Sequence, residues 1–201
     1  EKFKTIYADP PWKFKHYAGN MSPEYSKDRK YSTLTLKELC AIQVASLVDP
    51  PAHLYLWCPN AMLPDGLTLM KAWGFNFKTV LVWYKVRRDG GPDGRNLGYY
   101  FRNVTEMLLF GVIGSCVTRE AGRRTVNLFA STKRQHSQKP DSCYTLIESC
   151  SYPPYLELFA RYPRNGWTQL GEALGTGDLR TCLNNPPESS ISSGMTSMST
   201  S

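Results

Sequence analysis

The chain has 201 residues and a formal net charge of +7, with 41% hydrophobic residues, 20% charged residues and a mean hydropathy of -0.39. This length suits one domain with a buried core, and this composition excludes a disordered chain or a fibrous repeat. The basic excess favours a polyanionic partner. No apolar run reaches the roughly 20 residues of a membrane span, so we expect no membrane association and an intracellular protein, cytoplasmic in a prokaryote and nuclear in a eukaryote.

The cysteines and histidines predict neither a disulfide framework nor a metal site. The six cysteines form no Cys-x-x-Cys pair and lie mostly in apolar runs, which is typical of reduced, buried thiols. His16, His53 and His136 are far apart in the chain, and none lies near a cysteine at the spacing of a zinc site.

Short apolar runs bounded by turn residues predict six strands along the chain. They cover residues 3–8, 53–58, 79–84, 106–112, 125–129 and 156–160. Amphipathic patterns with start and stop signals predict three helices between these strands. They cover residues 36–48, where Thr35 and Glu38 form a capping box, 67–73, which Gly74 closes, and 140–150, which Pro140 begins.

Strands that alternate with helices at this spacing predict an α/β fold with a mostly parallel sheet and helices on both faces. We expect the last two elements to run antiparallel. Residues 1–180 are predicted to form one domain. Residues 181–201 are rich in Ser, Thr and Met with hardly a charge, and they are predicted to form a flexible tail.

The tetrapeptide Asp9-Pro10-Pro11-Trp12 directly follows the first predicted strand. In open α/β sheets, ligands bind beyond the carboxyl ends of the strands, so a motif in this place is a candidate site. Asp49-Pro50-Pro51 repeats the first three residues between a predicted helix and a strand, and we interpret that copy as a helix stop.

The first copy, Asp9-Pro10-Pro11-Trp12, suits an exocyclic amine on a flat base such as adenine. The lone pair of the amine nitrogen is delocalised into the ring. The carboxylate of Asp9 and the carbonyl of Pro10 would accept the two N–H bonds and localise the lone pair, while Trp12 stacks on the base. The prolines would fix the carbonyl in place before the substrate arrives. The same tetrapeptide fits a rigid loop with a packed Trp, and the local sequence does not separate the two hypotheses.

Ordered segments along the chain resemble the MT-A70 family of adenine N6-methyltransferases. They are Asp9-Pro10-Pro11-Trp12, Trp57, Ala72-Trp73-Gly74-Phe75, Trp83-Tyr84-Lys85, Gly98-Tyr99, Glu106, His136-Ser137-Gln138-Lys139-Pro140, Glu157-Leu158-Phe159-Ala160-Arg161 and Gly166-Trp167. The resemblance covers roughly residues 5–174. It implies a Rossmann-like class I methyltransferase fold, S-adenosylmethionine as the methyl donor, and methyl transfer to the N6 amine of adenine in DNA or RNA.

The resemblance also implies which residues form the site. It places the target base at the catalytic residues Asp9, Pro10, Pro11 and Trp12. It places the donor at Asp9, His136, Ser137, Lys139, Phe159, Arg161, Asn165 and Glu172. Lys139 would pair with the methionine carboxylate of the donor. Each assignment has a structural alternative: Lys139 fits a surface charge, Phe159 fits a core residue, and Glu157 fits a solvated carboxylate.

The chain departs from the family pattern at two places. Leu170-Gly171-Glu172-Ala173 replaces the usual Trp-Gly-Asn-Glu, so Glu172 stands where an Asn would contact the donor's adenine and cannot donate as an amide does. Thr105 stands where the human relatives carry a Lys before the residue that matches Glu106, so that contact is not carried over.

Basic residues interleaved with aromatic ones predict contacts to phosphates and bases in two segments, after Trp12 and after Lys85. The candidates are Lys13, Lys15, Tyr31, Arg87, Arg88, Tyr99 and Arg102. Solvated loops with core tyrosines at their roots are the alternative. Residues 13–30, 85–102 and 119–139 carry net charges of +3, +3 and +5, so they hold the whole basic excess. DNA is favoured over RNA because the compact chain lacks added RNA-binding modules.

The main rival hypothesis is a non-catalytic nucleic-acid-binding subunit of a heteromeric adenine methyltransferase. Such subunits typically lose the Asp of the tetrapeptide, and Asp9 favours activity, with or without a homo- or heteromeric partner subunit. A methyltransferase for a small amine or a protein would leave the basic aromatic segments unexplained. NAD and ATP are disfavoured because Gly175-Thr176-Gly177 lacks a strand before it and the chain has no phosphate-binding loop.

Overall fold

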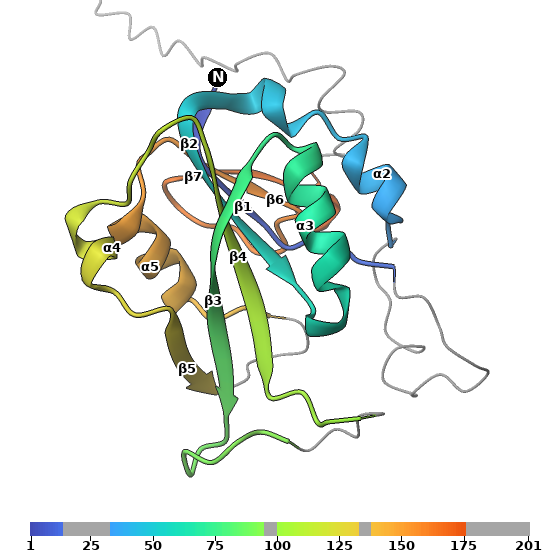
Figure 1. Ribbon diagram of the computed structural model, residues 1–201, viewed down its shortest axis with the longest axis vertical. Coiled ribbons are helices and arrows are strands. Elements are labelled where there is room, and N and C mark those ends of the chain that lie inside the picture. The colour runs from blue at the N-terminus through green and yellow to red at the C-terminus, as the bar shows by residue number, and fades with distance from the viewer. Residues whose placement is uncertain (14–32, 95–99, 133–137, 176–201) are drawn as a thin grey trace, which may run out of the picture.

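The computed structural model describes residues 1–13, 33–94, 100–132 and 138–175, which form one sheet with helices on both faces (Figure 1). The strands are β1 (Phe3–Ala8), β2 (Val48–Cys58), β3 (Asn76–Val86), β4 (Thr105–Ile113), β5 (Leu128–Thr132), β6 (Tyr155–Leu158) and β7 (Trp167–Leu170). The helices are α2 (Leu36–Cys40), α3 (Leu63–Ala72), α4 (Glu120–Arg124) and α5 (Ser142–Cys150). Short 3-10 turns cover Val44–Leu47, Asn60–Met62 and Glu172–Leu174.

The strands lie in the order β5-β3-β4-β2-β1-β6-β7, and only β4 runs against its neighbours in this described sheet. The mostly parallel sheet is therefore confirmed. The expectation of antiparallel last elements was wrong, because β5 pairs parallel to β3 and β6 pairs parallel to β1. β4 is antiparallel because it returns directly beside β3, and neighbouring strands joined without a crossover run in opposite directions.

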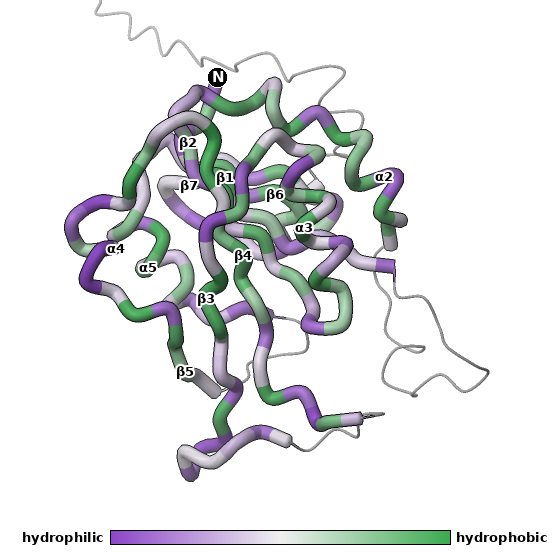
Figure 2. Tube along the Cα trace, in the orientation of Figure 1, coloured by the Kyte–Doolittle hydropathy of each residue, from purple (hydrophilic) through white to green (hydrophobic). Residues whose placement is uncertain are grey.

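Alternation along the central strands builds two hydrophobic cores. On β1, Ile6 packs with α2 and α3, whereas Tyr7 faces the core beneath α5. On β2, Leu56 packs in the core with α2 and α3, and Trp57 packs in the core beneath α5. These cores confirm that helices cover both faces. Figure 2 shows hydrophilic residues at α4 and along the described part of the connection from β3 to β4, among other places.

The five described cysteines are free thiols, and Cys58, Cys143 and Cys150 are buried. No helix in the described part of the chain is long and apolar enough to span a membrane. Residues 181–201, predicted to be a tail, lie outside the described residues.

The first predicted helix is much shorter than its apolar stripe suggested. Its capping box is present, since the Thr35 amide donates to Glu38 at 2.8 Å, but α2 ends at Cys40. Val48 already belongs to β2, which contains the second Asp-Pro-Pro copy, so the helix-stop interpretation was wrong. The register between β1 and β2 shifts between Phe3 and Thr5, and this irregularity accommodates prolines that cannot donate to a ladder.

The later strands differ from the prediction at their ends. β5 begins three residues after the predicted start because residues 120–124 form the short, polar α4. β6 ends at Leu158 because Phe159 adopts a positive φ of 63°. The sequence analysis missed β7, since half of its Trp-Thr-Gln-Leu run is polar.

Gly171 follows β7 at a close backbone approach. A Cβ on this residue would lie 2.2 Å from the Ala160 oxygen and 2.7 Å from its nitrogen. The Ala160 amide donates to the Leu170 carbonyl at 3.0 Å, so this approach joins the chain after β6 to the end of β7. Its φ of 179° suits any residue, so space rather than conformation requires glycine here.

We predict that Gly171→Ala lowers the free energy of unfolding by about 2 kcal/mol or more, because backbone atoms cannot move aside as a side chain can. Urea denaturation of the variant measures this change. Gly94→Ala is the matched control, since its nearest neighbour would lie at an ordinary 3.7 Å. Equal stabilities of the two variants would contradict the assigned role of Gly171.

Candidate active site

Charged side chains from four strands meet at one edge of the sheet. Asp9 follows β1, Arg161 follows β6, and Lys85 lies near the end of β3. Glu106 lies at the start of β4, which is antiparallel, so it reaches the same edge. Lys139 comes from the segment before α5. This is the carboxyl edge of the parallel strands, where ligands of open α/β sheets bind.

These five side chains, here called the ionic chain, alternate in sign. Lys139 Nζ lies 3.1 Å from Asp9 Oδ1 and 2.9 Å from Glu106 Oε1. Lys85 Nζ contacts Glu106 Oε2 at 2.9 Å, and Arg161 Nη2 lies 3.8 Å from Asp9 Oδ2. The ionic chain therefore has one more cation than carboxylates, which fits an anionic group of a ligand.

Aromatic rings form the floor of the ionic chain. Lys139 Nζ lies 5.1 Å from the centre of the Trp57 ring, and Lys85 Nζ lies 4.8 Å from that of Trp83. Trp57 Nε1 donates to the Tyr7 hydroxyl at 2.7 Å, which fixes the ring. Cation–π contacts and low exposure hold the two ammonium groups at defined positions.

Burial and charge act in opposite directions on the central groups. Burial raises the pKa of Glu106, but Lys139 and Lys85 outweigh it and lower that pKa to about 2. Burial lowers the pKa of Lys139, but Asp9 and Glu106 raise it overall. Both groups are therefore held in their charged forms.

The structure buries Trp12 at 6% exposure, and its Nε1 donates to the Trp57 carbonyl at 3.1 Å. The expected stacking of Trp12 on a base is therefore not available in this conformation, and the packed-Trp hypothesis holds for the ring. The Pro10 carbonyl accepts the Trp12 amide at 2.8 Å, which occupies one of its two lone pairs. Pro11 accepts the Leu34 amide at 2.9 Å and fixes the loop.

Of the residues expected to bind the donor, the structure brings together Asp9, Lys139 and Arg161. Phe159 packs partly buried against the core of α2 and α3. Asn165 and Glu172 are exposed on either side of β7. His136 and Ser137 lie outside the described residues.

The sequence analysis named Lys85 and Glu106 only within the segments that resemble the family and assigned neither of them to the site. Both lie two residues from buried members of their strands, Trp83 and Leu108, so strand alternation places them on the same face. That alternation was the signal that could have joined them to Asp9.

The alternative of a solvated Glu157 does not hold, because this residue is only 7% exposed. It accepts from the Tyr144 hydroxyl at 2.9 and 3.0 Å and from Gln169 Nε2 at 2.6 Å. Burial raises its pKa to about 7, and these hydrogen bonds offset the rise only in part.

The candidate nucleic-acid contacts in the described residues are Lys13, Arg87, Arg88 and Arg102, all exposed. The last three lie on the connection from β3 to β4, beside the ionic chain, where Arg87 pairs with Asp89 at 3.0 Å. Lys15, Tyr31 and Tyr99 lie outside the described residues.

Two aromatic rings on that connection are open to solvent. Tyr100 is 93% exposed and Phe101 is 85% exposed. The alternative of core tyrosines at the root of a solvated loop therefore does not describe these two rings, which are free to stack on bases.

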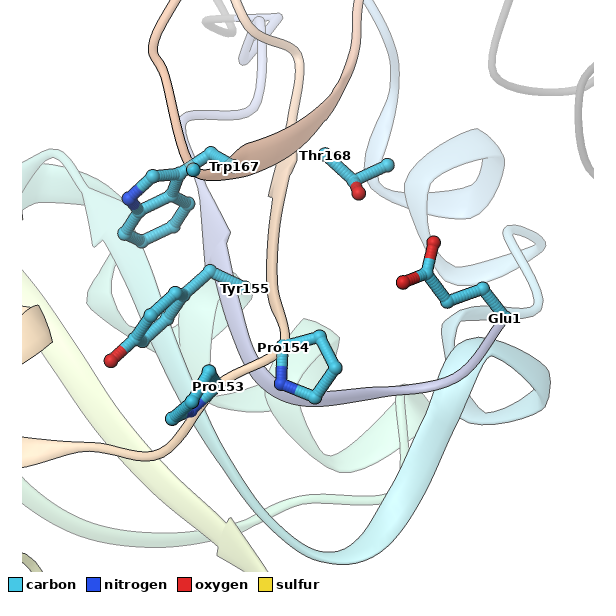
Figure 3. A pocket seen from close by; sticks show the side chains of 7 residues that line it. Glu1, Pro153, Pro154, Tyr155, Trp167 and Thr168 are labelled. Carbon is cyan, nitrogen blue, oxygen red and sulfur yellow. The ribbon is translucent and has the colours of Figure 1, made fainter. Parts of the chain in front are cut away.

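Two other features lie away from the ionic chain. A groove at the amino ends of β1, β6 and β7 is lined by Glu1, Pro153, Pro154, Tyr155, Gly166, Trp167 and Thr168 (Figure 3). His53 Nδ1 and the Tyr55 hydroxyl both contact Ser151 Oγ, but all three side chains are buried and a substrate cannot reach them. Among the described residues, no group of His, Cys, Asp and Glu could hold a metal ion.

We predict that Glu106→Gln lowers the free energy of unfolding by about 3 kcal/mol at pH 7. The charge of Glu106 stabilises the fold fully above its ordinary pKa of 4.5, and this stabilisation is lost as the pH falls through about 2. Urea denaturation from pH 7 to pH 2.5 should show the two proteins converging.

Glu120→Gln is the control, because the exposed Glu120–Arg124 pair contributes little to stability. A constant difference between wild type and Glu106→Gln at all pH values would contradict the electrostatic role.

Comparison with known proteins identifies the family. The MT-A70 family model matches residues 3–173. The type II methyltransferase M.MunI of a Mycoplasma species is 31% identical over 193 residues, which cover 85% of this chain and 77% of M.MunI.

Two eukaryotic proteins are 28% identical over 179 residues: a putative N(6)-adenosine-methyltransferase MT-A70-like protein of Medicago truncatula and an N(6)-adenosine-methyltransferase MT-A70-like protein of Drosophila melanogaster. The matched regions cover 86% of this chain but only 26% and 27% of those relatives. Because the family model matches most of the length of this chain, the chain belongs to the MT-A70 family and is a methyltransferase.

Proposed function

We propose that the protein transfers a methyl group from S-adenosylmethionine to the N6 amine of adenine in nucleic acid, with DNA favoured over RNA. The observation that carries this proposal is the position of Asp9, in an MT-A70 chain, at the carboxyl edge of the sheet within a net cationic site. The relatives named N(6)-adenosine-methyltransferases support the target atom.

The residues of the tetrapeptide act on the amine. The Asp9 carboxylate and the remaining lone pair of the Pro10 carbonyl accept the two N–H bonds, so the nitrogen lone pair becomes available for attack. As the new N–C bond forms, one of these protons must leave, and Asp9 is the adjacent carboxylate that can accept it. When bound, S-adenosylmethionine would supply an electrophilic methyl group, whose bond to the sulfonium sulfur breaks as the N–C bond forms and leaves the neutral thioether S-adenosylhomocysteine.

The cations of the ionic chain suit the carboxylate end of that donor. Lys139 is 13% exposed and Arg161 is 26% exposed, so both can contact a ligand. Glu106 keeps Lys139 charged and in place, which leaves Lys139 able to pair with a carboxylate without moving away from the site.

Exposed groups on the connection from β3 to β4 suit a nucleic acid. Arg88 and Arg102 would contact phosphates, and Tyr100 and Phe101 would stack on bases. We favour DNA because the type II methyltransferase M.MunI is more similar to this chain, at 31% identity, than the two relatives named N(6)-adenosine-methyltransferases, at 28%.

The activity test uses labelled S-adenosylmethionine with matched single-stranded DNA, duplex DNA and RNA, and mass spectrometry of the nucleosides. We expect N6-methyladenine, with DNA the better substrate, and a loss of at least about 100-fold in Asp9→Ala and Asp9→Asn.

Asp141→Asn is the control, since Asp141 precedes α5 outside the ionic chain. Absence of product on every substrate, with no donor bound, would instead support a non-catalytic binding subunit.

We predict that affinity for nucleic acid falls steeply with salt and that Arg88→Ala reduces the slope of log affinity against log salt by about 1. Fluorescence anisotropy of labelled single-stranded DNA measures both. Lys71→Ala, on α3 away from this edge, should leave the slope unchanged. A flat salt response of the wild type would remove the proposed role of the basic segments.

A further inference from the structure

The segment that connects β6 to β7, residues 159–166, holds three of the residues assigned to the donor: Phe159, Arg161 and Asn165. Gln169, on β7, holds the backbone of this segment through two hydrogen bonds. Gln169 Oε1 accepts the Arg164 amide at 2.7 Å, and Gln169 Nε2 donates to the Tyr162 carbonyl at 2.8 Å. Gln169 thereby bridges backbone groups on both sides of residue 163.

The Gln169 amide has one possible orientation. Its second N–H donates to Glu157 Oε2 at 2.6 Å, so both N–H groups and the oxygen have partners. A flipped amide would direct an N–H group at the Arg164 amide and its oxygen at a carboxylate. Tyr144 of α5 holds that carboxylate by donating to both of its oxygens.

A second anchor fixes the same segment. The Arg164 guanidinium lies 4.3 Å from the centre of the Tyr144 ring and contacts Glu148 Oε1 at 3.1 Å. Arg161, which lies between the anchored positions and β6, reaches Asp9 of the ionic chain. The segment is therefore tied to α5, β6 and β7 at once.

We propose that Gln169 and Glu157 are positioning residues, which hold residues 159–166 so that Arg161 faces Asp9 and the methyl donor. This proposal rests on the proposed function, because it assigns the donor to that segment. Neither residue needs to touch the donor. A charge-assisted hydrogen bond to Glu157 orients the Gln169 amide that donates it, and the amide orients the backbone.

Stability and function oppose each other at Glu157. Its charged form is disfavoured by burial and by Asp9, and favoured by Gln169, Tyr144 and Arg164. Tyr7 of β1 also interacts with it. Because its pKa in the folded protein is raised from the ordinary 4.5 to about 7, stability falls as the pH rises from 4.5 to about 7. Because the charged form of Glu157 lowers stability, we expect its charge to contribute to ligand binding instead.

The test measures binding of S-adenosylhomocysteine by calorimetry, hydrogen exchange of the Arg164 amide without ligand, and thermal unfolding. We expect Gln169→Leu to weaken binding about tenfold and to speed the exchange. Thr168→Val is the matched control, because Thr168 is on the same strand but lines the groove at the opposite edge (Figure 3).

Glu157→Gln keeps the shape and removes the charge. We expect it to be at least as stable as the wild type at pH 8 but to bind the ligand more weakly there, with the difference in affinity shrinking toward pH 6. A purely structural role predicts lower stability and no pH dependence of the affinity difference.

Unchanged binding in Gln169→Leu overturns the proposal, whether or not the exchange changes. Equal affinities of wild type and Glu157→Gln at pH 8 overturn the role of the charge. A wild-type protein that binds no S-adenosylhomocysteine refutes the proposed function itself, and this inference fails with it.

Discussion

Lys139 places one ammonium group between two carboxylates, and the arrangement of the site depends on this interaction. Asp9 and Glu106 come from strands that run in opposite directions. Without a cation between them, their two negative charges would repel each other at this edge. The aromatic ring of Trp57 beneath Lys139 removes water on one side and strengthens both ion pairs. A buried pair is costly to break, so this cluster defines one arrangement of β1, β4 and the segment before α5.

The antiparallel direction of β4 is what allows this cluster to form. A parallel strand in this place would have its amino end at the opposite edge, and Glu106 would lie far from Asp9. Instead, β3 and β4 bring Lys85 and Glu106 together at the base of their connection, and the same connection carries Tyr100 and Phe101 outward. The single reversed strand thus links the charged site to the exposed basic and aromatic segment.

The sequence predicted the fold class and a candidate site after the first strand, because both depend on local patterns. Alternating apolar strands and helices predict the sheet. Asp9 directly follows the first predicted strand, at the edge of the sheet where ligands bind. Two kinds of feature could not be predicted this way. β2 begins earlier than expected because a register shift accommodates Pro50 and Pro51, and β7 forms because β6 offers it an edge. The burial of Trp12 depends on contacts with Trp57, which is 45 residues away.

Glu106 and Glu157 show how the same side chain acquires opposite properties at one edge of a sheet. Glu106 faces two ammonium groups, which outweigh burial and lower its pKa to about 2. Burial and, to a lesser extent, the like charge of Asp9 raise the pKa of Glu157 to about 7, because its hydrogen bonds from Gln169 and Tyr144 offset burial only in part. A carboxylate paired with cations serves to fix charges in place. One held mainly by a hydroxyl and an amide orients those groups, and its charge is sensitive to pH near neutrality. The two carboxylates therefore differ in what they hold at this edge: Glu106 holds Lys85 and Lys139, and Glu157 holds, through Gln169, the backbone that carries Arg161.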